Sequence, residues 1–164
     1  MQQVNIVSYP VEILTGHYQI SGVMEVRGSP AVYVNDASFN TFSIHEATIT
    51  PLAPGSPVGQ VKTPLLYLPK AEPQVILIGN FEPKDAQLLT TIIRAVCFTD
   101  TYVVRAAFHV GPETKAIDIL DLTGPFLPTT AAEIFALRPL AADLGGEADL
   151  LYIHKDHVRT FYAE

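Results

Sequence analysis

The sequence predicts a mainly β protein made of two tandem copies of one small barrel, joined by a short helix. The first observation is an internal repeat, in which three short segments recur in the same order at nearly the same spacing. The second is the alternation of apolar and polar residues, which is typical of half-buried strands. The third is frequent Gly and Pro punctuation with little helical periodicity, which is typical of short strands in a small barrel.

The repeat is carried by three pairs of matching segments, which lie between 84 and 88 residues apart. In the first and second copies they are Thr15–Tyr18 and Thr99–Tyr102, Pro51–Ala53 and Pro139–Ala141, and Leu65–Lys70 and Leu150–Lys155. The repeat divides the chain into a first half, residues 1–80, and a second half, residues 81–164. Each half alone would be marginal in size for a stable core, so we expect the halves to share an interface.

Each half opens with a predicted hairpin whose second strand alternates between an apolar and a mostly polar face. The predicted strands are Val11–Thr15 and Tyr18–Val26 in the first half, and Ala95–Thr99 and Tyr102–Val110 in the second. Gly16–His17 joins the first pair and Asp100–Thr101 joins the second. We expect these residues to adopt the positive φ angles of a tight hairpin turn.

Four further strands are predicted in each half, and the last two of each set are expected to form a final hairpin. They are Ala31–Asn35, His45–Thr50, Pro64–Pro69 and Gln74–Ile78 in the first half, and Ala116–Leu120, Glu133–Arg138, Asp149–His154 and Val158–Tyr162 in the second. Between the halves, Phe81–Leu89 is the predicted linking helix, with Pro83 at its first position. Thr130–Glu133 resembles a capping box, but the repeat favours a strand there.

The composition limits the classes of partner. The 164 residues include 17 acidic and 10 basic side chains, 48% are hydrophobic and 16% are charged. The acidic balance and the lack of a basic cluster make a nucleic acid an improbable partner. No signal peptide or membrane-spanning stretch is recognised, which predicts a cytoplasmic protein. Cys97 is the only cysteine, so no internal disulfide is expected, and its place in a strand predicts a small buried apolar side chain.

These patterns resemble the Sm-like and SH3-like small barrels, and most of all a group of uncharacterised bacterial domains. The stretches that carry the resemblance are Val11–Val26, Val32–Asp36, Ala47–Pro51 and Leu65–Ile78 in the first half, and Thr99–Val110 and Leu150–Tyr162 in the second. Sm-type RNA binders resemble one another in an Asp and Asn pair and a later Arg-Gly. The first half has Asn35–Asp36 and the second half has Asp118 and Asp121 without Asn. Lys70 and Lys155 stand near the place of the Arg-Gly.

Four residues are therefore candidate binding residues. Lys70 and Lys155 are matched lysines beside the last strands, and they could contact an anion or could simply blunt a sheet edge against aggregation. Asp36 and Asp121 are matched acidic residues after the third strand. Their carboxylates could take part in binding, or could accept backbone N–H groups in Asx-turns.

No catalytic residue, metal site or cofactor is predicted. His154 and His157 could share a metal if a third ligand approached, but the interpretation preferred here is a solvated polar turn. No Gly-x-Ser-x-Gly motif occurs. The glycine pair Gly145–Gly146 is not followed by the Lys-Ser or Lys-Thr of a phosphate loop, and it is interpreted as a flexible turn.

The resulting hypothesis is a non-enzymatic binding or assembly module, whose partner is a second copy of itself or another protein. The low charge and the exposed strand edges of small barrels favour self-association. Two alternatives remain open. One is a flavin (FMN)-binding split-barrel oxidoreductase, and the other is an Sm-like RNA-binding protein.

Overall fold

A computed structural model describes residues 3, 5–144 and 147–164, so the predicted turn at Gly145–Gly146 lies outside the described residues. The chain forms one antiparallel sheet with short helices between its strands. The elements of the first half are β1 (Ile6–Leu14), β2 (Tyr18–Arg27), α1 (Pro30–Val34), β3 (Thr41–Pro51), β4 (Val61–Pro69) and β5 (Val75–Ile78). Those of the second half are α2 (Pro83–Ala86), β6 (Thr91–Phe98), β7 (Tyr102–Val110), η1 (Ala116–Asp121), β8 (Phe126–Ala136), β9 (Glu147–Ala148), β10 (Leu151–His154), η2 (Lys155–His157) and β11 (Thr160–Ala163).

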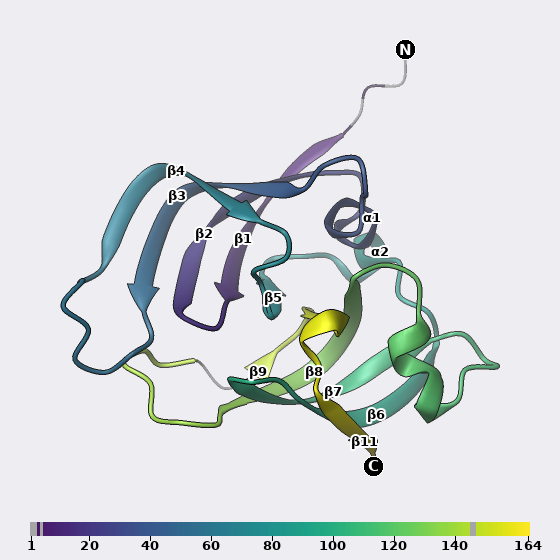
Figure 1. Ribbon diagram of the computed structural model, residues 1–164. Coiled ribbons are helices and arrows are strands. Elements are labelled where there is room, and N and C mark those ends of the chain that lie inside the picture. The colour runs from purple at the N-terminus through teal and green to yellow at the C-terminus, as the bar shows by residue number, and fades with distance from the viewer. Residues whose placement is uncertain (1–2, 4, 145–146) are drawn as a thin grey trace.

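The sheet is continuous through both halves and is not closed. Its order is β11-β6-β7-β8-β10-β5-β1-β2-β3-β4, with β9 added beside β8. Strands β1 to β4 gather in one part of the molecule and β6 to β8 with β11 in the other (Figure 1). The prediction of a mainly β fold is confirmed. In the described part of the chain, β4 and β11 form the two edges of this sheet.

The strands of the two halves are paired in matching registers. Ile13 faces Ile20 and Ile76 in the first half, and Cys97 faces Val104 and Phe161 in the second. The register between β3 and β4 is likewise reproduced between β8 and β10 and on into β9. Each half also carries one bulge at the corresponding place, between β2 and β3 and between β7 and β8. The extra residues lie on β3 and β8, and within these bulges Glu46 has φ 49° and Ala131 has φ 50°.

The hairpin turns differ from the prediction. None of the residues in Gly16–His17 and Asp100–Thr101 adopts a positive φ. The turns are stabilised by a threonine hydroxyl instead. Thr15 Oγ1 accepts hydrogen bonds from the backbone N–H groups of His17 and Tyr18 at 3.2 and 2.9 Å. Thr99 does the same for the second turn at the same two distances, so the matched threonines shape the turns.

Three other predictions about the elements are wrong. Residues 31–35 and 116–120 are not strands, because Ser29 caps α1, Pro30 starts it, and the second segment folds as the 3-10 helix η1. The final hairpins do not exist either. β4 pairs with β3 whereas β5 pairs with β1 and β10, and β11 pairs with β6.

The third error concerns the matched prolines. Pro51 faces Tyr18 in the sheet, and the residue that faces Tyr102 is Ala136 rather than Pro139.

The predicted linking helix is confirmed in a shorter form. α2 begins with Pro83 and ends at Ala86, before Gln87 at φ 51°.

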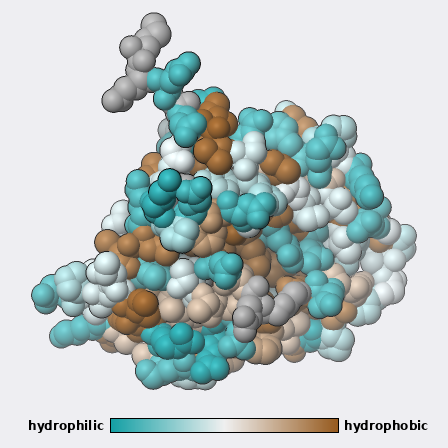
Figure 2. All heavy atoms as spheres, turned by 180° about the vertical axis from the view of Figure 1, so that it is seen from behind, coloured by the Kyte–Doolittle hydropathy of each residue, from teal (hydrophilic) through white to brown (hydrophobic). Residues whose placement is uncertain are grey.

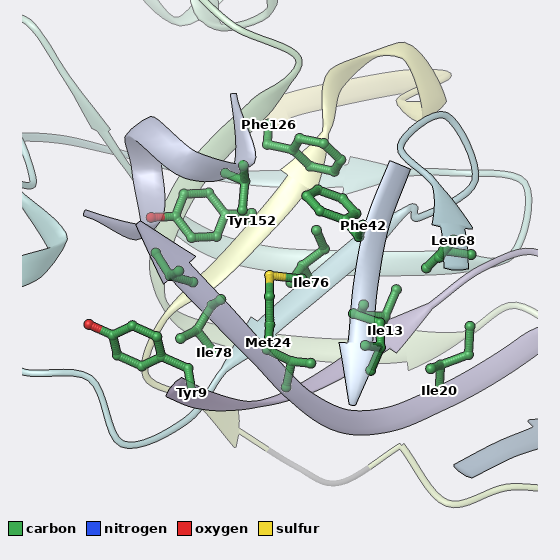
Figure 3. Close-up of a cluster of buried hydrophobic side chains, with 14 of the residues drawn as sticks. Tyr9, Ile13, Ile20, Met24, Phe42, Leu68, Ile76, Ile78, Phe126 and Tyr152 are labelled. Atoms are coloured by element: carbon green, nitrogen blue, oxygen red, sulfur yellow. The ribbon is translucent and has the colours of Figure 1, made fainter. Parts of the chain in front are cut away.

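Two apolar clusters lie on opposite sides of the strands shared by the halves. The first cluster contains the inward residues of β1 to β5 together with Phe126, Leu150 and Tyr152 of the second half. Figure 3 shows Tyr152 and Phe126 pointing into this cluster. The second cluster contains the inward residues of β6 to β10 together with Leu14, Leu52 and Val75 of the first half. Each half therefore completes the core of the other, as the marginal size of each half predicts.

Candidate interaction surface

Lys70 and Asp36 meet at the loop that follows α1. The Lys70 ammonium donates a hydrogen bond to the backbone carbonyl of Asp36 at 2.7 Å and lies 4.1 Å from the centre of the Phe39 ring. Partial burial lowers the pKa of Lys70, and nearby Asp36 opposes this shift. The Asp36 carboxylate accepts a 2.8 Å hydrogen bond from the backbone N–H of Ser38, which lowers the pKa of Asp36. This contact is the Asx-turn proposed from the sequence.

Lys155 occupies the corresponding place in the second half. Its ammonium donates to the carbonyl of Leu122 at 2.9 Å, one residue after Asp121 at the end of η1. Asp121 is exposed. No hydrogen bond or ion pair among the described residues joins the Lys70 and Asp36 pair to Lys155 and Asp121. Both ammonium groups are thus used to hold a loop of their own half, and the four candidates form two separate local contacts.

His154 and His157 lie together where β10 passes into η2, with ring centroids 5.0 Å apart. His154 is buried against Phe126, with ring centroids 4.7 Å apart, and its Nδ1 accepts the backbone N–H of Asp156. Burial, aided by His157, lowers the pKa of His154 to about 4. His157 Nε2 lies 2.7 Å from the carbonyl of Ala71 in the first half. The part of the chain that the structure describes contains no group of three or more His, Cys, Asp or Glu side chains able to hold a metal ion.

Cys97 is fully buried, and burial raises the pKa of its thiol to about 12. The thiol is therefore protonated at neutral pH and shielded from reagents. This placement agrees with the small apolar side chain expected from the sequence.

The most extensive contact between the halves is the pairing of β5 with β10. Leu151, Tyr152 and Ile153 lie opposite Leu77, Ile76 and Val75 in this ladder. The ladder is extended by hydrogen bonds from the His154 N–H to the Gln74 carbonyl at 2.9 Å and from the Ile78 N–H to the Leu150 carbonyl at 3.1 Å. We call this contact the junction. It is an edge of the second half occupied by a strand of the first half.

The junction also covers apolar side chains of the second half. Leu14, Leu52 and Val75 of the first half pack in one cluster with Tyr102, Leu151 and Ile153. The Tyr102 hydroxyl, fully buried here, donates to the Thr15 carbonyl at 2.7 Å. Strand pairing and apolar coverage therefore act together at this contact.

The corresponding surface of the first half is uncovered. Within the described ranges, β4 pairs with β3 and with no strand on its other side. Leu65 and Tyr67 on β4 are 37% and 65% exposed, although their matches Leu150 and Tyr152 are fully buried. Beside β4 lies an apolar groove of about 340 Å³. Its lining is Tyr18, Ile20, Ile49, Pro51, Val58, Gly59, Val61, Leu66 and Leu68. Apolar side chains also gather at several places on the face shown in Figure 2.

The opposite edge of the sheet is β11. It pairs with β6 on one side, and Glu164, the residue after it, forms ion pairs with Arg94 at 3.5 Å and with Arg105 at 2.7 Å. Phe161 packs inward against the second cluster, whereas Tyr162 is 55% exposed beside the ring of Phe98. β11 is therefore a short strand fixed to its own half that presents a free edge and an exposed aromatic ring.

Sequence reasoning missed these edge residues because it paired β4 with β5. The signal was present in the matching Leu65–Lys70 and Leu150–Lys155 segments, which are apolar at successive positions and so cannot place every apolar side chain in one core.

No known protein family, curated protein or solved structure was found to match this chain. None of the helices in the described ranges has the length and apolar character needed to cross a bilayer.

Proposed function

We propose that this protein is a non-enzymatic binding and assembly module, formed by duplication of one five-stranded unit that resembles a small, incompletely closed barrel. The duplication is supported by matching strand registers, bulges and threonine-stabilised turns at spacings of 84 and 85 residues. Each unit binds a partner by accepting an added strand along its fourth strand and by covering the apolar residues beside it.

The observation that carries this proposal is the junction itself. In the second half, β10 accepts β5, and the apolar residues beside β10 are covered by Leu14, Leu52 and Val75. In the first half, the equivalent strand β4 and its groove have the same kinds of residue, but no strand among the described residues pairs with the outer side of β4. A free edge beside exposed apolar side chains is a surface suited to strand addition.

A peptide tests this function independently of what occupies the surface naturally. Residues 73–79 contain β5, the segment that adds to β10 at the junction. A labelled peptide of this sequence, with lysines added at its ends for solubility, is expected to bind the protein in a fluorescence anisotropy titration. The same peptide with Leu77→Asp is the matched control, because Leu77 lies opposite Leu151 and packs against the second cluster at the junction, so the charge would face the groove beside β4.

The protein variant Tyr67→Pro provides the second control. Lys70 N–H donates to the Asn40 carbonyl in the ladder with β3, so by alternation the N–H of residue 67 points to the free side of β4. Proline at this position removes the outward donor and leaves the β3 ladder in place. We expect peptide binding to fall at least about 10-fold. Equal affinity for both peptides, or for wild type and Tyr67→Pro, would reject strand addition at β4.

A further inference from the structure

We propose that the occupant of the β4 edge is β11 of a second copy of this chain, so that copies associate head to tail. This inference rests on the proposed function and names its partner. The second half already shows how its β10 edge and the side chains beside it are covered by β5 and neighbouring residues of the first half. β4 matches β10 and β11 matches β5, and both remain free on their outer sides in the described part of the chain.

The junction fixes the register of this contact. Leu151 faces Leu77, Tyr152 faces Ile76 and Ile153 faces Val75. When this register is applied to the equivalent residues of β4 and β11, Leu66, Tyr67 and Leu68 of one copy lie opposite Tyr162, Phe161 and Thr160 of the second copy. The same matches follow independently from the pairing of β5 with β1 and of β11 with β6.

Side-chain placement agrees with this register. Alternate residues of β5 face different cores: Ile76 and Ile78 belong to the first cluster, and Val75 belongs to the second. By the same alternation, Phe161 packs in its own half and Tyr162 points away from that core. In the assembled pair, Tyr162 would enter the apolar groove beside β4 of the other copy. Leu137, which is exposed and matches Leu52, would lie beside it.

The outer face of β4 also gains partners. Leu150 and Tyr152 point from β10 into the core of the other half and are fully buried. Their matches on β4 are Leu65 and Tyr67, which would face the second half of the neighbouring copy near Phe161. Tyr18 would then match Tyr102, whose hydroxyl donates to Thr15 across the junction. The contact therefore accounts for exposed apolar residues on both edges of one sheet.

One difference weakens the new contact relative to the junction. Pro69 stands where His154 donates its N–H to Gln74, and proline has no donor. The contact between copies therefore has one hydrogen bond fewer and, unlike the junction, is not aided by a covalent link between the two units. Because the two surfaces differ, a pair of copies still has one free β4, on one copy, and one free β11, on the other, and the association continues to closure or to an open chain.

Size-exclusion chromatography with light scattering tests the proposal through two blocked variants. Tyr67→Pro removes the outward donor of β4, and Tyr162→Asp places a charge on the residue expected to enter the groove. Wild type is expected to form oligomers, and each variant alone is expected to associate at least about 100-fold more weakly. An equimolar mixture of the two is expected to give only a one-to-one dimer, since one intact β4 and one intact β11 remain. Circular dichroism of each variant checks that it folds.

Disulfide trapping then tests the register. Cys97 is the only cysteine and is buried, so introduced cysteines can be followed without interference. A Leu66→Cys chain mixed with a Tyr162→Cys chain is expected to give a mixed disulfide under mild oxidation. Leu66→Cys mixed with Phe161→Cys is the matched control, because its residues lie one step out of register on opposite faces.

The outcomes separate the proposal from the function on which it rests. A monomeric wild type that still binds the β5 peptide would overturn the head-to-tail contact and leave strand addition intact. Loss of both peptide binding and self-association would reject the proposed function as well. Oligomers that persist in both blocked variants, or a Leu66→Cys chain that crosslinks mainly to itself, would overturn the pairing of β4 with β11.

Discussion

Replacing Tyr102 or Tyr152 by phenylalanine removes one buried hydroxyl at almost constant volume. Tyr102 lies in the second apolar cluster and Tyr152 in the first, so the two substitutions probe the two faces of the junction. Both side chains are fully buried, and burial raises the pKa of each phenol above its ordinary value, so both are neutral at pH 7. They differ in hydrogen bonding. The Tyr102 hydroxyl donates to the Thr15 carbonyl at 2.7 Å, whereas the Tyr152 hydroxyl has no hydrogen-bond partner within the described part of the chain.

This difference gives the two substitutions opposite signs. Tyr102→Phe leaves the Thr15 carbonyl without its donor in a buried place, which is expected to lower the free energy of unfolding by about 1–2 kcal/mol. Tyr152→Phe removes a buried hydroxyl whose desolvation is not offset by a hydrogen bond, and is expected to raise the free energy of unfolding by up to about 1 kcal/mol. The two variants should therefore differ by about 2 kcal/mol.

Urea unfolding followed by far-ultraviolet circular dichroism at pH 7 measures this difference. Both substitutions are made in the Tyr67→Pro background, so that self-association does not contribute to stability. Equal slopes of free energy against urea would show that the unfolded states are comparable. If the two variants lose the same stability, or if Tyr152→Phe is the less stable, the assignment of the junction hydrogen bond to Tyr102 is wrong.

Three further substitutions test other contacts by the same unfolding measurement. Asn35→Ala removes hydrogen bonds between the Asn35 amide and the backbone of Phe126, and should cost about 1–2 kcal/mol; an unchanged value would show that this link between the halves is dispensable. Ala131→Gly should stabilise by about 0.5–1 kcal/mol, because Ala131 has φ 50° and glycine adopts that region freely; a loss would contradict the strain. For His154, burial lowers the folded-state pKa from 6.5 to about 4, so between these pH values the unfolded chain binds a proton that the folded chain does not. The stability contributed by the neutral ring is therefore fully present above pH 6.5 and is lost as the pH falls towards 4. The loss in the free energy of unfolding is at most about 3 kcal/mol. His154→Asn should flatten the pH dependence in that window, and an unchanged slope would argue against titration of His154.

The elements that the sequence predicted well are those set by alternation. Inward residues of β2 and β7 such as Met24 and Phe108 are fully buried, as period-two patterning indicated. α1 and η1 were missed because Val32–Val34 are β-branched or aromatic, and Ile117 and Ile119 are β-branched, and such residues favour strands by propensity. Local capping by Ser29 and tertiary contacts overcame that propensity.

The pairing of the last strands could not be predicted from the sequence. A five-residue connection between β4 and β5 favours a hairpin by length alone, and nothing local shows that β5 leaves β4 to lie between β1 and β10. The candidate surface depends on this long-range arrangement. By contrast, the Asx-turn of Asp36 could be predicted because it is local, whereas the hydrogen bond from Lys70 to the Asp36 carbonyl was not predicted.

Pro69 shows how an exposed apolar edge can remain selective. By the alternation that turns the N–H of residue 67 outward, Pro69 removes an outward donor beside Leu68, whereas the nitrogen of Pro64 lies on the β3 side. The loss of this donor shortens the free ladder at one end, which restricts pairing with long extended segments of unrelated chains. β11 is itself only four residues long and is held in place by the ion pairs of Glu164. A short edge that ends at a proline and a short strand fixed in a folded half suit each other, because little conformational entropy is lost when they pair.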